Sequence, residues 1–235
     1  DRAGIQALKK TLDTLGYFAR SVADIGLLYG AVTGHAVPDD AGRPKIGLCR
    51  TPMWSDAEDC SRAALESAGS ALSAAGYDVS DIDLPAEFDT IEDPFRVISN
   101  YEGKNALADE FRNHMDKMNA WNSETGKSIW SEQEYADAVV TASAARNALG
   151  IVYDEYPVLL TPSTGGEAPA DLVNVTMSSF NRMWTLMHGP TITLPVAKGP
   201  NGMPVGVQLA ARTGDDAALI ARTAEIHRVL EAKMA

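Results

Sequence analysis

The histidine and cysteine side chains of this sequence are too scattered to form a metal site. The four histidines stand at positions 35, 114, 188 and 227, and none has a cysteine, a carboxylate or a second histidine at ligand spacing. Protein zinc sites are built from such closely spaced donors. Cys49 and Cys60 are too few for a disulfide framework, so we expect two reduced, partly buried thiols. The sequence therefore predicts no metal ion.

Patterns that mark a catalytic nucleophile or a phosphate-binding loop are absent from these 235 residues. There is no G-x-S-x-G elbow of the kind that α/β-hydrolases use. Gly30 and Gly34 flank a helix end, whereas a phosphate loop joins a strand to a helix. A Ser-His-Asp triad stays open, because such residues meet only in space. From these patterns we assign no catalytic residue and expect no cofactor.

The charge of the chain narrows the choice of partners. Its formal net charge is −12, spread along the sequence and not gathered in a tail. Such a surface repels nucleic-acid phosphates and anionic membranes, so we expect neither as a partner. No secretory signal and no apolar run of membrane-spanning length is present, so the expected location is the cytoplasm.

The first part of the chain predicts a β-α-β unit behind an amphipathic helix. Apolar residues spaced by three and four from Phe18 to Val32 indicate a helix over 17–33. An apolar run over 45–49 and a second one over 77–84 indicate strands. Between them the pattern favours a helix over 56–76, with Asp56 as its N-cap and Gly76 just past its end. We expect the two strands to be parallel neighbours.

The second part predicts more helices and the rest of a sheet. Residues 91–153 read as polar and helical, with a break around Gly126. The elements expected after that segment are a strand over 157–161, a helix over 178–187, strands over 191–196 and 204–210, and a helix over 215–232. The turn at 198–202 predicts that the last two strands pair antiparallel. The fold class is therefore α/β, a mixed β-sheet covered by helices.

Two stretches resemble the amidase-signature family of hydrolases. Thr11-Leu-Asp-Thr-Leu-Gly-Tyr-Phe-Ala-Arg-Ser-Val-Ala-Asp24 is similar to the Leu-Asp-Thr-x-Gly-x-x-Ala-Arg-Ser/Thr-Val-x-Asp segment that follows the family's signature region. Phe180-Asn-Arg-Met-Trp-Thr185, His188-Gly-Pro190 and Gly202-Met-Pro-Val-Gly-Val-Gln208 are similar to the family's closing block. Val158-Leu-Leu-Thr-Pro162 falls where the family has a strand and loop. The wording is nearest to malonamidase-like small-acid amidases.

The resemblance implies chemistry whose reacting groups are not in this chain. Members of the family use a nucleophilic serine, a second serine on a cis peptide and a neutral lysine base, all ahead of the Leu-Asp-Thr segment. A buried lysine has a lowered pKa and so can accept a proton relayed through the bridging serine. Nothing here resembles Gly-Gly-Ser-Ser-Gly-Gly-Ser, and Lys9, Lys10 and Lys45 lack the family's lysine context. We therefore expect residues 1–235 to be the carboxy-terminal portion of a single amidase-signature domain, with 91–153 as its polar helical segment.

By the same resemblance, this portion supplies walls of the substrate pocket. The loop after the Leu-Leu-Thr-Pro strand and the helix with Phe-Asn-x-x-Trp-Thr face the acyl group in the family. The residues expected to border the pocket are Thr161, Ser163, Phe180, Asn181, Trp184 and Thr185. Trp184 at helical spacing from Phe180 also suits plain core packing. Asp13 and Thr14 are expected to secure a loop.

The resemblance leaves three functions open. The first is the pocket-forming part of an amidase that hydrolyses a small carboxylic amide to acid and ammonia. Its expected partners are the amino-terminal portion that carries the triad, in the same or a separate chain, and the amide substrate, with a homodimer left open. The others are an amidase-like subunit of a tRNA-dependent amidotransferase and a catalytically inactive amidase-like binding protein. A solute-binding α/β domain would not account for the two similar stretches.

Overall fold

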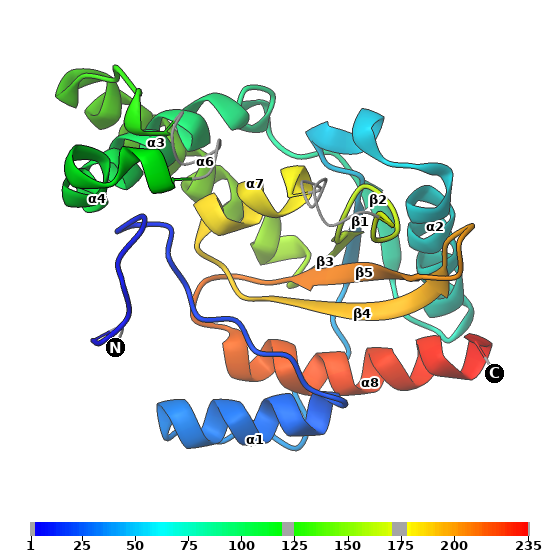
Figure 1. Ribbon diagram of the computed structural model, residues 1–235. Helices are drawn as coiled ribbons and strands as arrows, with labels where there is room; N and C mark the ends of the chain where they lie inside the picture. Colours follow the sequence, from blue (N-terminus) through cyan, green and yellow to red (C-terminus); the bar gives the residue numbers. More distant parts are fainter. Residues whose placement is uncertain (1–2, 119–124, 171–177, 235) are drawn as a thin grey trace.

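The computed structural model describes residues 3–118, 125–170 and 178–234, and a mixed five-stranded sheet forms its centre (Figure 1). The strands are β1 (Ile46–Cys49), β2 (Val79–Ile82), β3 (Val158–Pro162), β4 (Thr191–Lys198) and β5 (Pro204–Ala210), in the spatial order β2-β1-β3-β5-β4. β2, β1 and β3 run parallel, whereas β5 is antiparallel to both of its neighbours. The predicted α/β class with a mixed sheet is confirmed.

The predicted β-α-β unit is present, although its helix begins later than expected. β1 and β2 are parallel neighbours joined through α2 (Asp59–Ala74). Asp56 ends a short 3-10 helix (Pro52–Asp56), and Glu58 is the N-cap of α2 with no side-chain cap bond. The choice of Asp56 as N-cap was wrong, because Pro52 starts this separate turn. Gly76 follows the helix with φ 85°, as predicted, since glycine adopts the left-handed region without strain.

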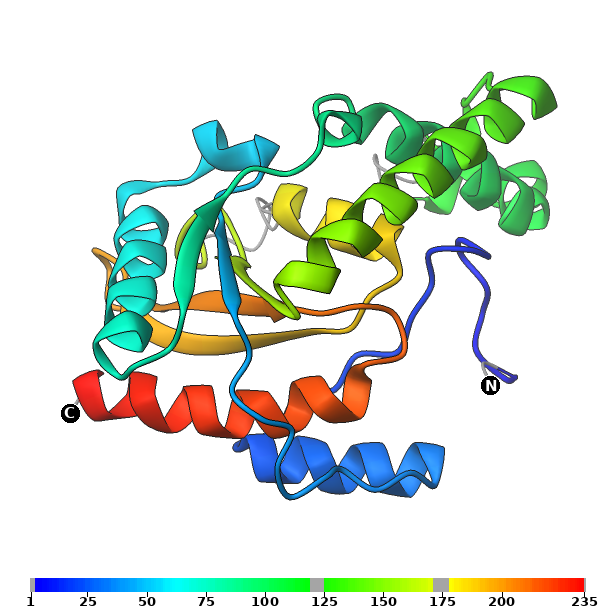
Figure 2. The same ribbon diagram turned by 180° about the vertical axis from the view of Figure 1, so that it is seen from behind.

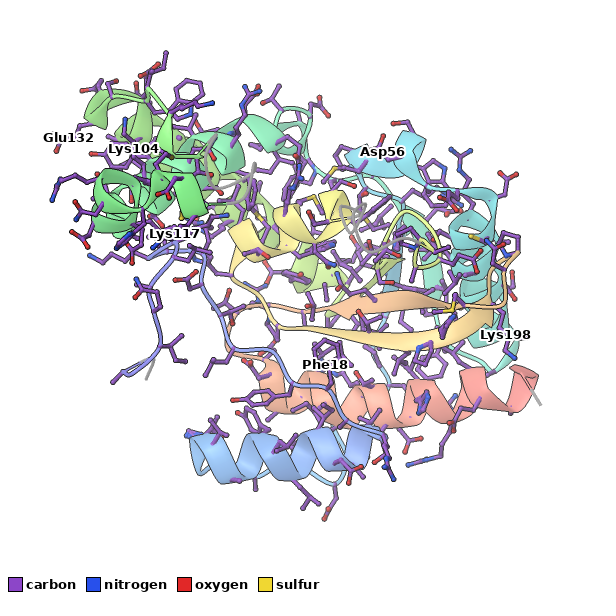
Figure 3. All side chains as sticks on the ribbon, in the orientation of Figure 1. Phe18, Asp56, Lys104, Lys117, Glu132 and Lys198 are labelled. Atoms are coloured by element: carbon purple, nitrogen blue, oxygen red, sulfur yellow. The ribbon has the colours of Figure 1, made fainter. Side chains whose placement is uncertain are left out.

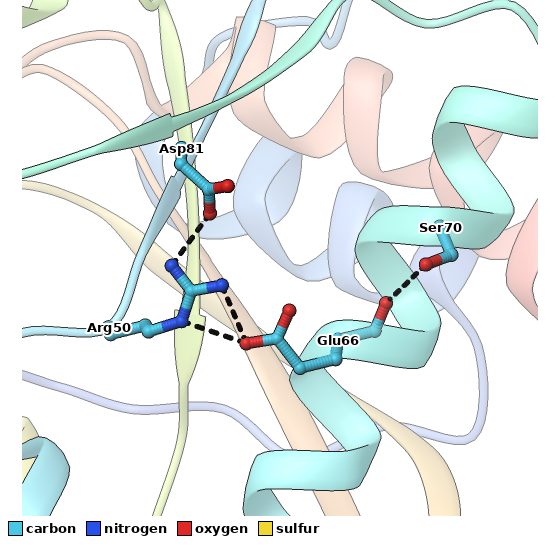
Figure 4. Close-up of polar contacts among 4 residues, drawn as sticks. All are labelled: Arg50, Glu66, Ser70 and Asp81. Carbon is cyan, nitrogen blue, oxygen red and sulfur yellow. Dashed lines mark hydrogen bonds and ion pairs between the residues drawn. The ribbon is translucent and has the colours of Figure 1, made fainter.

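Arg50 connects the three elements of this unit at the end of β1 (Figure 4). Its guanidinium donates to the Glu66 carboxylate on α2 at 2.8 Å and to Asp81 on β2 at 2.6 Å. All three side chains are partly exposed, so the two ion pairs contribute only about 0–1 kcal/mol each. Their main effect is to fix the angle at which the crossover helix meets the strands.

Helices cover both faces of the sheet (Figures 1 and 2). Alternate side chains of a strand point to opposite faces, so Leu160 of β3 packs with α2 and α8 (Asp216–Met234). Leu159 packs instead with α7 (Ser179–Met187) and α6 (Glu132–Glu155). The two clusters form separate cores on either side of one sheet, which makes the described chain a three-layer structure.

The polar segment after β2 extends from the sheet as a group of helices. It contains α3 (Glu92–Ala106), α4 (Ala108–Asn113), a 3-10 turn (Met115–Lys117) and then α6. α6 begins with a capping box, in which Ser131 and Glu134 exchange hydrogen bonds. The predicted break therefore lies at 114–131, of which residues 119–124 are outside the described part.

The last helix follows the sequence pattern, whereas the first one corrects it. Leu219, Thr223, Ile226 and Leu230 are buried along one side of α8, as the spacing predicts. α1 begins at Val22 and ends at Thr33, because Ser21 caps it by accepting from the Asp24 N–H at 3.1 Å. Residues 17–20 precede the cap, so the helix starts later than its apolar spacing predicts.

This correction leaves a row of apolar side chains in solvent. We call Leu15, Tyr17, Phe18, Leu27 and Val32 the amino-terminal apolar surface. Phe18 is 102% exposed, on the extended segment that passes in front of α8 (Figure 3). α1 packs on α8 through one side, which carries Ile25 and Tyr29, so Leu27 and Val32 remain exposed. Large contiguous apolar patches on a protein mark an interface with something else.

The hairpin at the edge of the sheet forms as predicted. β4 and β5 pair antiparallel around a turn in which Gly202 has φ 83°. β4 is longer than expected because pairing resumes after a shift between Pro195 and Ala197. In the described residues β2 and β4 are the outer strands of the sheet, each with one unpaired edge.

Candidate functional site

The carboxyl ends of β1 and β3 lie side by side at one edge of the sheet. The two strands are parallel, so Thr51 after β1 and Ser163 after β3 emerge in the same direction. Ligands of α/β proteins bind preferentially at such carboxyl edges. This edge also carries the loop that the sequence analysis assigned to the pocket.

Hydrogen bonds from three other elements hold the first residues of that loop. Ser163 Oγ donates to the Gly206 carbonyl of β5 at 3.0 Å. Ser61 Oγ of α2 donates to the Thr164 carbonyl at 3.0 Å, and the Glu58 N–H donates to the Gly165 carbonyl at 2.6 Å. Each bond comes from a different part of the sheet or its helices. The loop is therefore a preorganised wall, at least over residues 163–167.

Glu167 ends this wall as a buried carboxylate. Its side chain is 7% exposed and accepts from the Asn201 N–H at 2.8 Å, Asn201 Nδ2 at 2.6 Å and the Met203 N–H at 3.0 Å. Burial acts to raise the pKa of Glu167, but these three hydrogen bonds outweigh it and hold the pKa below its ordinary value. Glu167 thus fastens the loop after β3 to the β4–β5 turn.

We expect Glu167→Gln to destabilise the protein at neutral pH and to have less effect in acid. A carboxyl whose pKa is lowered by folding stabilises the protein above its unfolded pKa, about 4.3, and loses that contribution as pH falls through the folded pKa. Thermal midpoints of both proteins, measured from pH 7 to pH 3.5, test this. A gap that stays constant over that range would contradict the assignment of the ionised form.

Helix α7 turns a strongly apolar side toward the sheet. Phe180 and Trp184 are buried in the core that contains Leu159, and Trp184 is only 3% exposed. The indole Nε1 of Trp184 has no hydrogen-bond partner within the described residues. Buried indole N–H groups normally find an acceptor. Trp184 is therefore both a core residue and a donor pointing at something that the described residues do not supply.

Asn181 lies on the same helix and contacts the loop directly. Its Nδ2 donates to the Ser163 carbonyl at 3.1 Å, so the structure brings these two predicted pocket residues together. Thr185 follows one turn later, partly exposed, and its carbonyl accepts from the His188 N–H at 3.3 Å. The pocket assignment of the six residues stays a prediction. Their placement shows that Asn181 positions the loop whether or not it also touches a ligand.

Thr161 forms part of a polar row that crosses the sheet beneath α7. The strand register places Thr161 of β3 opposite Gln208 of β5, and Gln208 opposite Thr193 of β4. Thr161 and Gln208 are buried, and neither Thr161 Oγ1 nor Gln208 Nε2 has a partner among the described residues. Unpaired buried polar groups are rare in proteins. The sequence analysis missed Gln208, which a two-residue period counted back from the buried Ala210 would have placed on this face.

Thr51 is a second residue that the sequence did not single out. It has φ 64° and ψ 159°, a region that side chains other than glycine avoid, and its Oγ1 is buried without a described partner. Backbone strain of this kind costs of order 1–3 kcal/mol and gathers at functional sites. Its position beside the loop at 163–167 fits that tendency, and no sequence signal marks a strained threonine.

The Thr11-Leu-Asp-Thr14 stretch is fixed by two carboxylates. Asp13 accepts from the backbone N–H groups of Leu8 and Lys9 at 2.8 and 2.9 Å, so it secures its own loop as expected. Thr11 donates through its N–H and Oγ1 to Glu102 of α3, both at 2.8 Å. Tyr135 Oη of α6 donates to the same carboxylate at 2.8 Å. Glu102 thereby joins the amino-terminal segment to two helices.

Within the residues that the structure describes, no three histidine, cysteine, aspartate or glutamate side chains gather as a metal site would require. Across those residues no helix is long and apolar enough to cross a membrane. Lys45, just ahead of β1, is held protonated, because its hydrogen bond to Glu155 at 3.1 Å raises its pKa. The arrangement at the strand ends can shape and orient a ligand through its hydrogen-bond donors.

Comparison with known proteins gives a consistent picture. The family described as Amidase matches residues 1–220. A 2-amino-5-chloromuconic acid deaminase from Comamonas testosteroni is 26% identical over 92% of this chain and 51% of its own length. A glutamyl-tRNA(Gln) amidotransferase subunit from Deinococcus deserti is 23% identical over 93% of this chain and 55% of its own. A crystal structure of an amidase has a TM-score of 0.79 at 22% identity, over 97% of this chain and 54% of that one.

The family match extends over most of the chain and includes both stretches of motif residues. The chain spans about half the length of the curated relatives that it matches. The solved amidase shares the mixed sheet and its helices in the same arrangement. The chain therefore belongs to the amidase family.

Proposed function

We propose that this chain is the carboxy-terminal, pocket-forming portion of an amidase that hydrolyses a small carboxylic amide to an acid and ammonia. A Ser–cis-Ser–Lys triad in an amino-terminal portion would perform the chemistry. The observation that carries the proposal is the family match over residues 1–220 by a chain half as long as its relatives. Acyl transfer to a serine followed by hydrolysis is the reaction that this triad supports.

The surface of the described residues supports the presence of a second portion. The amino-terminal apolar surface is exposed, and the outer edges of β2 and β4 are unpaired. Exposed apolar patches and open strand edges favour association with another polypeptide segment. The amino-terminal portion of the same amidase, in the same or a separate chain, is the partner that we propose for them. We place the intact protein in the cytoplasm.

In this proposal the loop at 163–167 and helix α7 form the acyl side of the pocket. Trp184 and Phe180 would limit the size of the acyl group, and Asn181 would keep the loop in place through Ser163. Thr161 and Ser163 lie on the adjoining strand end, and Thr185 on the next turn of α7. The shape of this wall, more than the triad, would set which amides are accepted.

The test is a comparison of the 235-residue chain with the full-length protein. We expect the chain alone to release no ammonia from acetamide, propionamide, malonamate or benzamide, because the nucleophile is absent. The full-length protein should release ammonia and should be labelled by a fluorophosphonate that reacts with activated serines. Replacing its expected nucleophilic serine with alanine is the matched control. Ammonia release by the purified 235-residue chain would refute the proposal.

Part of a tRNA-dependent amidotransferase is the alternative with support among the relatives, since one component of such an enzyme matches 93% of the chain. That function needs a second subunit to hold the tRNA. Co-purification of such a partner with the full-length protein would favour it. An inactive amidase-like binding protein is the remaining alternative, and absence of the lysine or either serine from the full-length sequence would favour that one.

A further inference from the structure

A cavity of about 340 Å³ lies at the other end of the sheet from the loop at 163–167. It is bounded by the last turns of α6, the end of α7 and the segment that follows β5. The residues that matter for its chemistry are Arg146, Leu149, Asp154, Met187 and Arg212. Since α6 leads into the start of β3 and the loop follows its end, the strand separates the two places. The volume is within the range of small-molecule sites, about 300–1,000 Å³.

The positive charges of this cavity are unequal in their partners. Arg212 donates to the Asp154 carboxylate at 2.5 Å and to the Gly150 carbonyl at 2.6 Å. Arg146 donates to the Leu186 carbonyl at 2.8 Å and to Ser143 Oγ at 3.0 Å, and in the described ranges no carboxylate forms an ion pair with it. Arg212 is therefore neutralised, whereas Arg146 leaves the lining with one positive charge.

The uncompensated charge is partly removed from water. Burial lowers the pKa of Arg146, which shows that its charged form is less well solvated than in bulk water. His188, whose pKa is lowered by burial and by the charge of Arg146, adds no positive charge at neutral pH. A guanidinium in this state gains from a bidentate anion more than an exposed one does.

The opposite side of the cavity is apolar. Leu149 and Met187 are buried side chains of the second core, and Tyr153 lies beside them. A ligand for this space needs an anionic end for Arg146 and an apolar body for Leu149 and Met187. A phosphate or sulfate would meet only the first requirement.

We propose that this cavity is a second binding site, separate from the amidase pocket, and that it takes a small organic carboxylate. The carboxylate group would pair with Arg146, and the apolar part would rest on Leu149 and Met187. The Arg212–Asp154 pair would form the polar rim. The inference does not rest on the proposed amidase activity, because the residues involved lie away from the strand end that carries the pocket.

Binding of 4-fluorobenzoate to the full-length protein, followed by ¹⁹F NMR, tests this site. We expect saturable binding that weakens as KCl is raised, since the contact is ionic. Arg146→Gln should weaken it about tenfold or more, the loss of a charge-assisted pair. 4-Fluorobenzyl alcohol, which has the same ring and no charge, should bind at least about tenfold more weakly to the unchanged protein.

Two further variants keep the result interpretable. Arg62→Gln is the matched control, because Arg62 is also partly buried and donates to the carbonyls of Ala57 and Trp54, outside the cavity. It should leave 4-fluorobenzoate binding unchanged. Asn147→Asp keeps Arg146 and the size of the side chain, but it adds a carboxylate to the lining, so it should also abolish binding. Binding that stays unchanged in Arg146→Gln or in Asn147→Asp, or an equal loss in Arg62→Gln, would overturn the proposal.

Discussion

Replacing Trp184 with alanine should lower the free energy of unfolding of the intact protein by roughly 3–5 kcal/mol, the cost of removing a large aromatic side chain from a packed core. Trp184 is 3% exposed and packs with Phe180 and Leu159 beneath α7. The surrounding side chains belong to a strand and two helices, so the space cannot collapse easily. Chemical denaturation at neutral pH measures this loss.

Trp184→Phe separates core packing from substrate contact. Phenylalanine keeps an aromatic ring but lacks the Nε1 donor, which has no partner among the described residues. The stability loss should therefore be well below that of the alanine variant. If the donor serves the acyl group, kcat/KM for an amide with a polar acyl group should fall about tenfold while stability changes little. Unchanged kcat/KM across short and long amides would show that Trp184 is core alone.

Replacing Glu102 with alanine should cost about 3 kcal/mol and release the amino-terminal segment. The carboxylate is 7% exposed and accepts from the Thr11 N–H, Thr11 Oγ1 and Tyr135 Oη. Without it those donors lose a buried partner, which costs about 1–3 kcal/mol for each unsatisfied group. Trypsin should then cut faster at Lys9 and Lys10, which lie just before Thr11.

A spectroscopic readout distinguishes this role from a general loss of stability. Burial, together with the hydrogen bond and charge of Glu102, raises the pKa of Tyr135 to about 12. In Glu102→Ala the pKa of Tyr135 should fall, and in Glu102→Gln, which keeps one acceptor, it should change in the same direction. Glu87→Ala, at an exposed position, is the control for loss of a negative charge. A Tyr135 pKa that is equal in all three variants would contradict the proposed tie.

The strands and their pairing could be predicted because their signals are local. The apolar run at 45–49, the turn at 198–202 and the spacing of Leu219 to Leu230 each reflect a period or a turn that neighbouring residues fully specify. Helix starts were less accurate. Ser21 and Pro52 moved them by a few residues, since capping and turn geometry compete with periodicity over a single turn.

The candidate site was harder to foresee because it depends on contacts between distant segments. Neither the strain at Thr51 nor the carboxylate tie from Glu102 to Thr11 has a signature in one sequence. The family motifs identified α7 and the strand end correctly as elements. They did not reveal that Asn181 bonds to Ser163, or that Gln208 lies opposite Thr161.

The parallel pairing of β1 with β3 has a consequence for how the protein is made. Ile46 pairs with Val158, 112 residues further along the chain, whereas β4 and β5 are joined by a short turn. At translation rates of roughly 5–20 residues per second, β1 leaves the ribosome roughly 6–22 s before its partner. Throughout that interval the fully buried strand Ile46–Cys49 can pair only with β2. Its other edge is a site for chaperone binding or for pairing with a neighbouring nascent chain until α6 has been completed.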